Sequence, residues 1–176
     1  MIYKHFRVVL LLSSLLLLAG CDKGLAPDPT GFSGVITFIN WPPADSILEL
    51  RLAAFKVPPT DTSGLFLEWV KGNVIIYPPV GTPAFRKFNE SGQLVDSIRY
   101  TSVLQGVTTL EPVRYSYVAL AWRYGKDSFK DWRPAGIYTL QPGSFTPALL
   151  TVFKHEFVAG IDIRCDFHNL PPRPWR

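Results

Sequence analysis

Side chains that could carry out catalytic or metal chemistry are few in this chain, and they do not follow known patterns. Three histidines are present, but no cysteine or paired carboxylate stands at ligand spacing from them, so a zinc site is not expected. His155 and His168 are predicted to be exposed. No Gly-x-Ser-x-Gly elbow, Walker loop or Gly-x-Gly-x-x-Gly run occurs. The sequence therefore predicts a protein that is not an enzyme and that uses no cofactor or metal.

Aromatic residues near prolines are the best candidates for a binding site. Trp41 opens a Trp-Pro-Pro turn, and Trp132 is flanked by Asp131, Arg133 and Pro134. Both tryptophans are predicted to lie in loops, which usually carry the binding residues of a β-sandwich. An aromatic ring beside an arginine can stack on and hydrogen-bond a sugar or a peptide. Trp41, Trp132 and Arg133 are therefore candidate ligand-binding residues. The other interpretation, which we prefer, is that these tryptophans fix the loops against the ends of the sandwich.

The first twenty residues have the pattern of a secretory signal peptide. A basic start with Lys4 and Arg7 precedes a short apolar run, and small residues follow it. The run is shorter than the roughly 20 residues that a membrane-spanning helix needs. The sequence Leu-Ala-Gly-Cys at 18–21 closely resembles the bacterial lipobox. This resemblance implies that the signal is cleaved before Cys21, that Cys21 is lipidated, and that the acyl chains anchor the protein to a membrane.

The second cysteine is predicted to be buried and inert. In residues 161–168 apolar and polar side chains alternate, which is typical of a half-buried strand. The alternation places Cys165 on the apolar face with Ile163, and it places Asp162 on the exposed face, where it should contribute little to stability. A reactive thiol needs partial exposure and nearby positive charge. Because lipid would block Cys21, Cys165 has no expected disulfide partner.

Composition and charge narrow the class of protein. The chain has 176 residues, of which 47% are hydrophobic and 18% charged, so it is too apolar to be disordered. The net charge is +4 without a block of Lys or Arg, so nucleic acid is not an expected partner. The length fits one domain with short flanking segments. We predict a helical signal peptide at 1–20, a flexible tether at 21–31, a β-sandwich domain at 32–170 and a Pro-rich tail at 171–176.

The distribution of proline and glycine predicts strands rather than long helices. Sixteen Pro and thirteen Gly leave little room for a helix, because Pro disrupts a helix interior. The expected strands, about seven in all, lie near residues 34–39, 48–55, 73–77, 96–104, 115–123, 149–153 and 161–168. Short strands separated by turn signals indicate an antiparallel β-sandwich. Residues 63–71 fit either one helical turn or a loop.

Several of these segments resemble a known family. Gly-Val-Ile-Thr-Phe at 34–38, a Trp-Pro-Pro turn and Leu-Arg-Leu-Ala-Ala-Phe at 50–55 resemble the start of a carboxypeptidase-regulatory-like domain. The run at 115–122 is similar to the central strand of that family. The resemblance implies a transthyretin-like or Ig-like β-sandwich over roughly residues 32–170. The usual Pro-Gly-x-Tyr before the central strand is replaced by Glu-Pro-Val-Arg-Tyr at 111–115. A shared fold does not imply a shared function.

Together these features predict a lipid-anchored, non-catalytic β-sandwich of the bacterial cell envelope, in the periplasm or on the cell surface. It would act as an interaction or accessory module. Its partners would be the membrane, through the N-terminal lipid, and an envelope protein or a glycan. The alternative is a carbohydrate-binding lipoprotein that uses Trp41 and Trp132.

Overall fold

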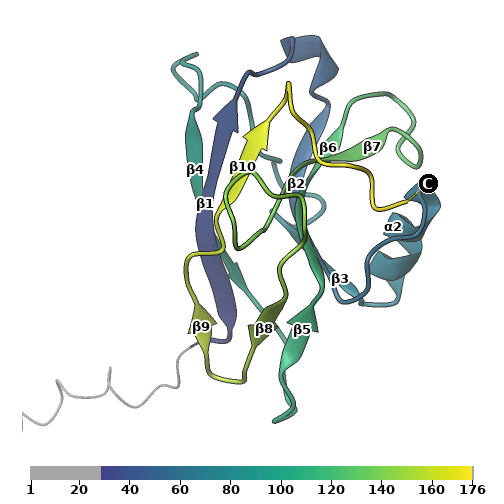
Figure 1. Cartoon of the computed structure of the whole chain (residues 1–176), viewed down its shortest axis with the longest axis vertical. Helices are drawn as coiled ribbons and strands as arrows, with labels where there is room; N and C mark the ends of the chain where they lie inside the picture. Colours follow the sequence, from purple (N-terminus) through teal and green to yellow (C-terminus); the bar gives the residue numbers. More distant parts are fainter. Residues whose placement is uncertain (1–28, 176) are drawn as a thin grey trace, which may run out of the picture.

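The computed structural model describes residues 29–175, except the side chains of residues 63–65. The predicted signal peptide, Cys21 and most of the tether therefore lie outside the described residues. The described chain consists mostly of β-strands with one α-helix, which confirms the predicted all-β sandwich (Figure 1). No helix in residues 29–175 combines the length and hydrophobicity that a membrane span requires.

One layer of the sandwich is built around β1 (Gly31–Ile39). On one side β1 pairs antiparallel with β4 (Ser97–Val103). On the other side β10 (Ile163–Asp166) and β9 (Phe157–Val158) pair parallel to β1. The sheet is therefore mixed, whereas the short strands separated by turn signals predicted antiparallel pairing alone. Parallel neighbours need a long connection, and here the whole second layer of the sandwich lies between β1 and β10 in the sequence.

The second layer is an antiparallel sheet in the order β3-β2-β6-β7. Its strands are β3 (Val74–Tyr77), β2 (Glu49–Phe55), β6 (Tyr117–Arg123) and β7 (Trp132–Ile137). A two-stranded pair of β5 (Val113–Tyr115) and β8 (Leu150–Val152) lies at the end of the molecule where β1 begins (Figure 1). The short 3-10 helix η2 (Ala44–Ser46) lies between β1 and β2.

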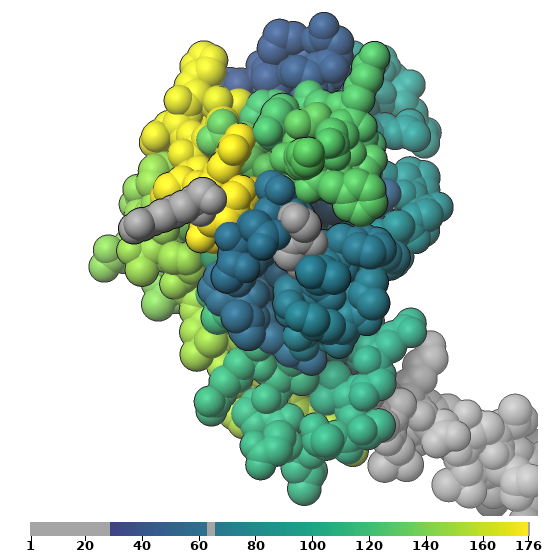
Figure 2. Space-filling model, turned by 90° about the vertical axis from the view of Figure 1, so that its right-hand side faces the viewer, coloured from purple at the N-terminus to yellow at the C-terminus, as the bar shows by residue number. Residues whose placement is uncertain are grey.

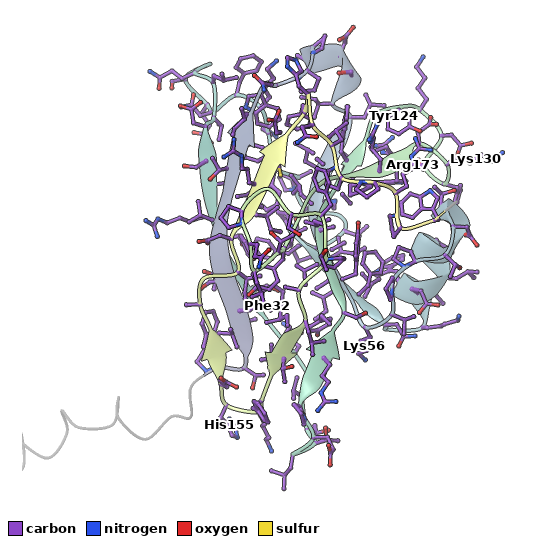
Figure 3. All side chains as sticks on the ribbon, in the orientation of Figure 1. Phe32, Lys56, Tyr124, Lys130, His155 and Arg173 are labelled. Carbon is purple, nitrogen blue, oxygen red and sulfur yellow. The ribbon has the colours of Figure 1, made fainter. Side chains whose placement is uncertain are left out.

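The main core fills the space between the two layers. Phe32 and Ile36 of β1 face Leu52 and Leu120 of the second sheet, and none of the four is more than 1% exposed. Figure 3 shows Phe32 in the interior. Ile163 of β10 is also buried, as its strand pattern predicted. Burying apolar side chains of this size stabilises the fold by about 1.5–3 kcal/mol each.

The predicted burial of Cys165 is confirmed. Its side chain is fully buried, and this burial raises the pKa of the thiol well above its ordinary value. Gly136 of β7 lies directly against it, since a Cβ at that position would be 2.5 Å from the sulfur. The close contact between β7 and β10 at this point requires a glycine.

A second apolar cluster lies on the outer face of the β3-β2-β6-β7 sheet. It contains Phe55, Val74, Tyr117 and Ile137, so β2 and β6 are apolar on both faces, as the sequence predicted for residues 115–123. Helix α2 (Thr62–Val70) lies on this outer side, away from β1 (Figure 1). Residues 63–71 fitted either one helical turn or a loop in the sequence, and the structure shows that this segment forms helix α2.

Candidate functional site

Trp41 is half-buried and packs against the core at one end of the sandwich. Its ring stacks on Phe38 with a centroid distance of 4.3 Å and on Phe167 at 4.9 Å. Its Nε1 donates a hydrogen bond to the Val95 carbonyl oxygen at 2.9 Å. Both faces of the indole and its one polar atom are therefore used within the protein. This geometry favours the interpretation that Trp41 fixes the loop after β1.

Trp132 is the first residue of β7 and does not lie in a loop, which corrects the sequence-based prediction. Pro134 made the segment resemble a loop because proline cannot donate a ladder hydrogen bond. However, β7 is the outermost strand of its sheet, and a register shift opposite Leu120 and Ala121 forms a β-bulge there. Edge strands and bulges are the places where a sheet tolerates proline.

Trp41, Trp132 and Arg133 do not form one surface. Trp132 faces the outer side of the second sheet together with Ala121. Trp41 is on the inner side, because it contacts the Phe167 ring that packs against Trp122 of the main core. Arg133 follows Trp132 in the strand, so it points to the opposite face of β7. The shared ligand surface that would combine the three residues is therefore not present.

An apolar groove of about 300 Å³ lies between α2 and the outer face of the second sheet. Phe66 and Trp69 of α2 form one wall, and Phe129 and Trp132 form the other. The Phe66 and Phe129 rings meet edge to face at 5.7 Å. Figure 2 shows a recess at this position, between α2 and the segment around residues 124–132. We call this feature the aromatic groove.

The floor of the aromatic groove is hollow because two central strands carry small residues there. Ala53 of β2 and Ala121 of β6 line the floor, and both point to the outer face. The walls above them remain open to solvent. Phe66 is 46% exposed, Trp69 41% and Phe129 55%. A contiguous exposed apolar surface of this kind marks an interaction site more often than a single exposed residue does.

One end of the aromatic groove is polar, because Glu49 and Arg51 line it, and Arg123 beside them brings a net positive charge. Glu49 forms ion pairs with both Arg51 and Arg123, so one carboxylate serves two guanidinium groups. Arg51 also donates hydrogen bonds to the carbonyl oxygens of Pro78 and Thr82, at 2.7 and 2.8 Å. Arg123 lies 5.9 Å from the centre of the Trp132 ring, within cation–π range. The arginines thus fix the loop after β3 and orient Trp132.

A second, polar cleft of about 610 Å³ lies between β10 and residues 138–145. Its carboxylates bind the backbone and side chains of their own sheet. Asp162 accepts a hydrogen bond from the Val35 N–H at 2.8 Å. Asp166 accepts hydrogen bonds from the Asn40 side chain and the His168 N–H, and these bonds lower the pKa of its carboxyl. The two aspartates therefore act as structural acceptors that tie β10 to β1 and to its own following turn.

The histidines do not join either cleft. His155 and His168 are exposed, as predicted. Figure 3 places His155 at the end of the molecule opposite Tyr124 and Arg173. Within residues 29–175 no group of three or more His, Cys, Asp or Glu side chains is placed to hold a metal ion.

No known protein family, curated protein or solved structure matches this chain. The class that the geometry defines is an all-β sandwich with a solvent-open aromatic groove on the outer face of one sheet. Sequence reasoning identified Trp132 but missed Phe66, Trp69 and Phe129. Residues 65–70, Leu-Phe-Leu-Glu-Trp-Val, carry one charge among five apolar residues, and this signal for an exposed apolar helix was available.

Proposed function

We propose that this protein is a lipid-anchored, non-catalytic β-sandwich of the bacterial cell envelope that binds a partner protein through the aromatic groove. The N-terminal pattern that ends at Cys21 supports the anchor and the location. The groove supports the role as an interaction module. The likeness to carboxypeptidase-regulatory-like domains stays a prediction from the sequence.

The observation that carries the proposal is the exposed aromatic wall. Phe66, Trp69 and Phe129 keep about half of their surface in water although the Phe66 ring contacts the other two. Leaving such rings exposed costs free energy that a partner's apolar side chain would recover on binding, at about 25 cal/mol per Å². Aromatic residues around a pocket are also the usual anchors of protein interfaces.

The polar end of the groove indicates which residue of the partner should lie next to the apolar side chain that enters the groove. The ion network of Glu49, Arg51 and Arg123 has one more positive charge than negative. A carboxylate from the partner would complement it. The proposed occupant is therefore a partner segment in which an aromatic or aliphatic side chain lies next to an Asp or Glu.

A glycan is the alternative occupant. A sugar could stack on Trp132, and the hydroxyl groups of Thr62 and Ser128 line the same groove. Sugars need several hydrogen-bond partners, however, and the groove walls are mostly aromatic and aliphatic. Because the Trp41 ring already stacks on Phe38 and Phe167, the pair of tryptophans is not available to a sugar, so we prefer the protein partner.

A matched pair of variants tests the groove. Phe129→Ala removes part of the wall, and Phe153→Ala removes a phenylalanine of similar exposure, 51%, that does not line the groove. Phe129→Ala should weaken crosslinking to envelope proteins in cells by about tenfold or more, because a truncated hot-spot aromatic costs about 2 kcal/mol. Phe153→Ala should leave crosslinking unchanged. Equal behaviour of the two variants would exclude the groove as the interface, and binding on a glycan array alone would favour the sugar.

Cys21→Ser tests the anchor independently. The substitution should abolish lipidation and release the chain from the membrane fraction or leave its signal uncleaved. Mass spectrometry of the native N-terminus provides the measurement. An unmodified Cys21 with cleavage elsewhere would refute the anchor and leave the groove proposal intact.

A further inference from the structure

Arg133 and Tyr124 are neighbours on the inner face of the second sheet. The strand register places Arg133 directly opposite Trp122. Tyr124 lies two residues beyond Trp122, and its N–H continues the pairing by donating to the Asp131 carbonyl oxygen at 3.0 Å. Side chains two residues apart along a strand share a face, so the Tyr124 ring is diagonal to Arg133. The Trp122 and Tyr124 rings confirm this placement, since they meet edge to face at 5.9 Å.

A second arginine reaches the same tyrosine from the C-terminal tail. Arg173 Nη2 donates a hydrogen bond to the Tyr124 hydroxyl oxygen at 3.2 Å, and its guanidinium carbon lies 6.0 Å from the ring centre. Figure 3 shows the two side chains next to each other. The tail thus brings a second guanidinium group to the position where the register has already placed Arg133.

Neither guanidinium has a counter-ion within the described part of the chain. The ion pairs there involve Arg51, Arg123 and Lys71, and neither Arg133 nor Arg173 takes part. The Nε–H of Arg133 is buried and donates to no described acceptor. Burial and then the charge of Arg173 lower the pKa of Arg133, and Tyr124 partly offsets this effect. Two like charges therefore lie close together, and the Arg133 Nε–H is an unused donor.

Two neighbouring guanidinium groups without a counter-ion cost free energy, and a bound anion would lower this cost. A buried donor without a partner loses its hydration without recovering a hydrogen bond. The planar guanidinium fork matches the two oxygens of a carboxylate or a phosphate, and these charge-assisted bonds are about twice as strong as neutral ones. We propose that Arg133 and Arg173 form a binding site for an oxyanion, a carboxylate or phosphate group, beside Tyr124.

This site is separate from the aromatic groove. Arg133 points to the opposite face of β7 from Trp132, and neither arginine lines the groove. The proposal therefore does not depend on the identity of the groove partner. The oxyanion could be inorganic phosphate, a carboxylate or the phosphate of a lipid headgroup, and the experiment distinguishes these sources.

Calorimetry on the full chain in a neutral detergent tests the proposal. Three ligands are titrated at matched ionic strength: sodium phosphate, sodium acetate, and glycerophosphoglycerol, which is an anionic lipid headgroup without acyl chains. We expect saturable binding of at least one of them, and the preferred ligand identifies the source. Arg133→Gln and Arg173→Gln should each lower that affinity by about tenfold or more, because each removes a charged hydrogen-bond partner. Arg99→Gln, which changes an exposed arginine of β4, should have no effect.

Two outcomes would overturn the site. One is the absence of saturable binding by all three ligands. The other is binding that Arg133→Gln and Arg173→Gln leave unchanged. Circular dichroism checks that each variant is folded, and Arg173→Gln, in the exposed tail, keeps the test decisive if Arg133→Gln disturbs β7. A rise of the melting temperature with the bound ligand, lost in the same two variants, gives a second readout.

Discussion

Replacing Trp41 and Trp132 by alanine should affect stability very differently, although both tryptophans lie within two residues of a proline. Trp41→Ala removes two stacked ring contacts, with Phe38 at 4.3 Å and Phe167 at 4.9 Å. Each aromatic pair contributes about 0.5–1.5 kcal/mol beyond the area it buries. The substitution also leaves the Val95 carbonyl without its 2.9 Å hydrogen bond, which is worth about 1 kcal/mol. The expected loss is about 3 kcal/mol, at the lower end for a large aromatic deletion.

Trp132→Ala should cost much less. The Trp132 ring lines a solvent-open groove, so its removal creates no closed cavity. It loses the hydrogen bond from Nε1 to the Ser128 carbonyl at 2.8 Å and the contact with Arg123. Both lie at the surface, where such interactions contribute little. The expected loss is about 1 kcal/mol.

Urea and thermal melts followed by circular dichroism measure the difference. For a domain of this size 1 kcal/mol corresponds to about 2–4 °C, so Trp41→Ala should lower Tm by about 6–12 °C and Trp132→Ala by about 3 °C. Trp41→Phe is the control, because it keeps an aromatic ring for the stacking and loses the hydrogen bond and part of the ring, so it should cost less than Trp41→Ala. If Trp132→Ala destabilises the protein as much as Trp41→Ala, the assignment of the two rings to the inner and outer sides is wrong.

Buried hydroxyl groups, one exposed carboxylate and one buried thiol supply the remaining tests. Tyr117→Phe should leave the free energy of unfolding unchanged or raise it slightly, because this buried hydroxyl has no partner among the described residues. Tyr100→Phe should cost about 1 kcal/mol in the same urea melts, because its hydroxyl donates to a backbone carbonyl at 2.6 Å. Asp162→Ala should also cost about 1 kcal/mol, since its carboxylate holds a β1 N–H. Cys165 should react with a thiol reagent only in denaturant, because its sulfur is fully buried. Burial raises the pKa of Tyr115 to about 12 and the pKa of the Cys165 thiol well above its ordinary value, so melts should show constant stability from neutral pH up to the ordinary thiol pKa of about 8.5 and a loss at higher pH.

At Asp162 the alternation in the sequence predicts the exposure of the side chain but not its hydrogen-bond partner. The alternation in residues 161–168 correctly placed Asp162 on the exposed face. It also indicated that the residue contributes little to stability, because most exposed side chains do. The structure gives its carboxylate a backbone partner on β1, from a segment more than a hundred residues earlier. Exposure follows from the local period of the strand, whereas a hydrogen-bond partner depends on which strand lies alongside.

The same distinction applies to the candidate site. Trp132 was recognisable as a candidate binding residue from its neighbours in the sequence, and it lines the aromatic groove. Its partners in the groove, Phe66 and Trp69, come from a helix that no motif connects to β7. They meet because α2 lies on the same outer face, and that face is hollow because Ala53 and Ala121 are small. The position of α2 and the hollow beneath it both depend on how the elements pack in the folded protein.

The sequence by itself determined the β class, the inward side of β10 with Cys165, and the two apolar faces of β6. These properties depend on the period of two residues along a strand, which is a property of consecutive residues. Tertiary structure alone decided that β10 runs parallel to β1, that Pro134 lies in an edge strand, and that Arg173 meets Tyr124. Each of these results joins segments that are distant in the chain. Their pairing depends on the total burial and hydrogen bonding of the folded protein, and no local pattern encodes it.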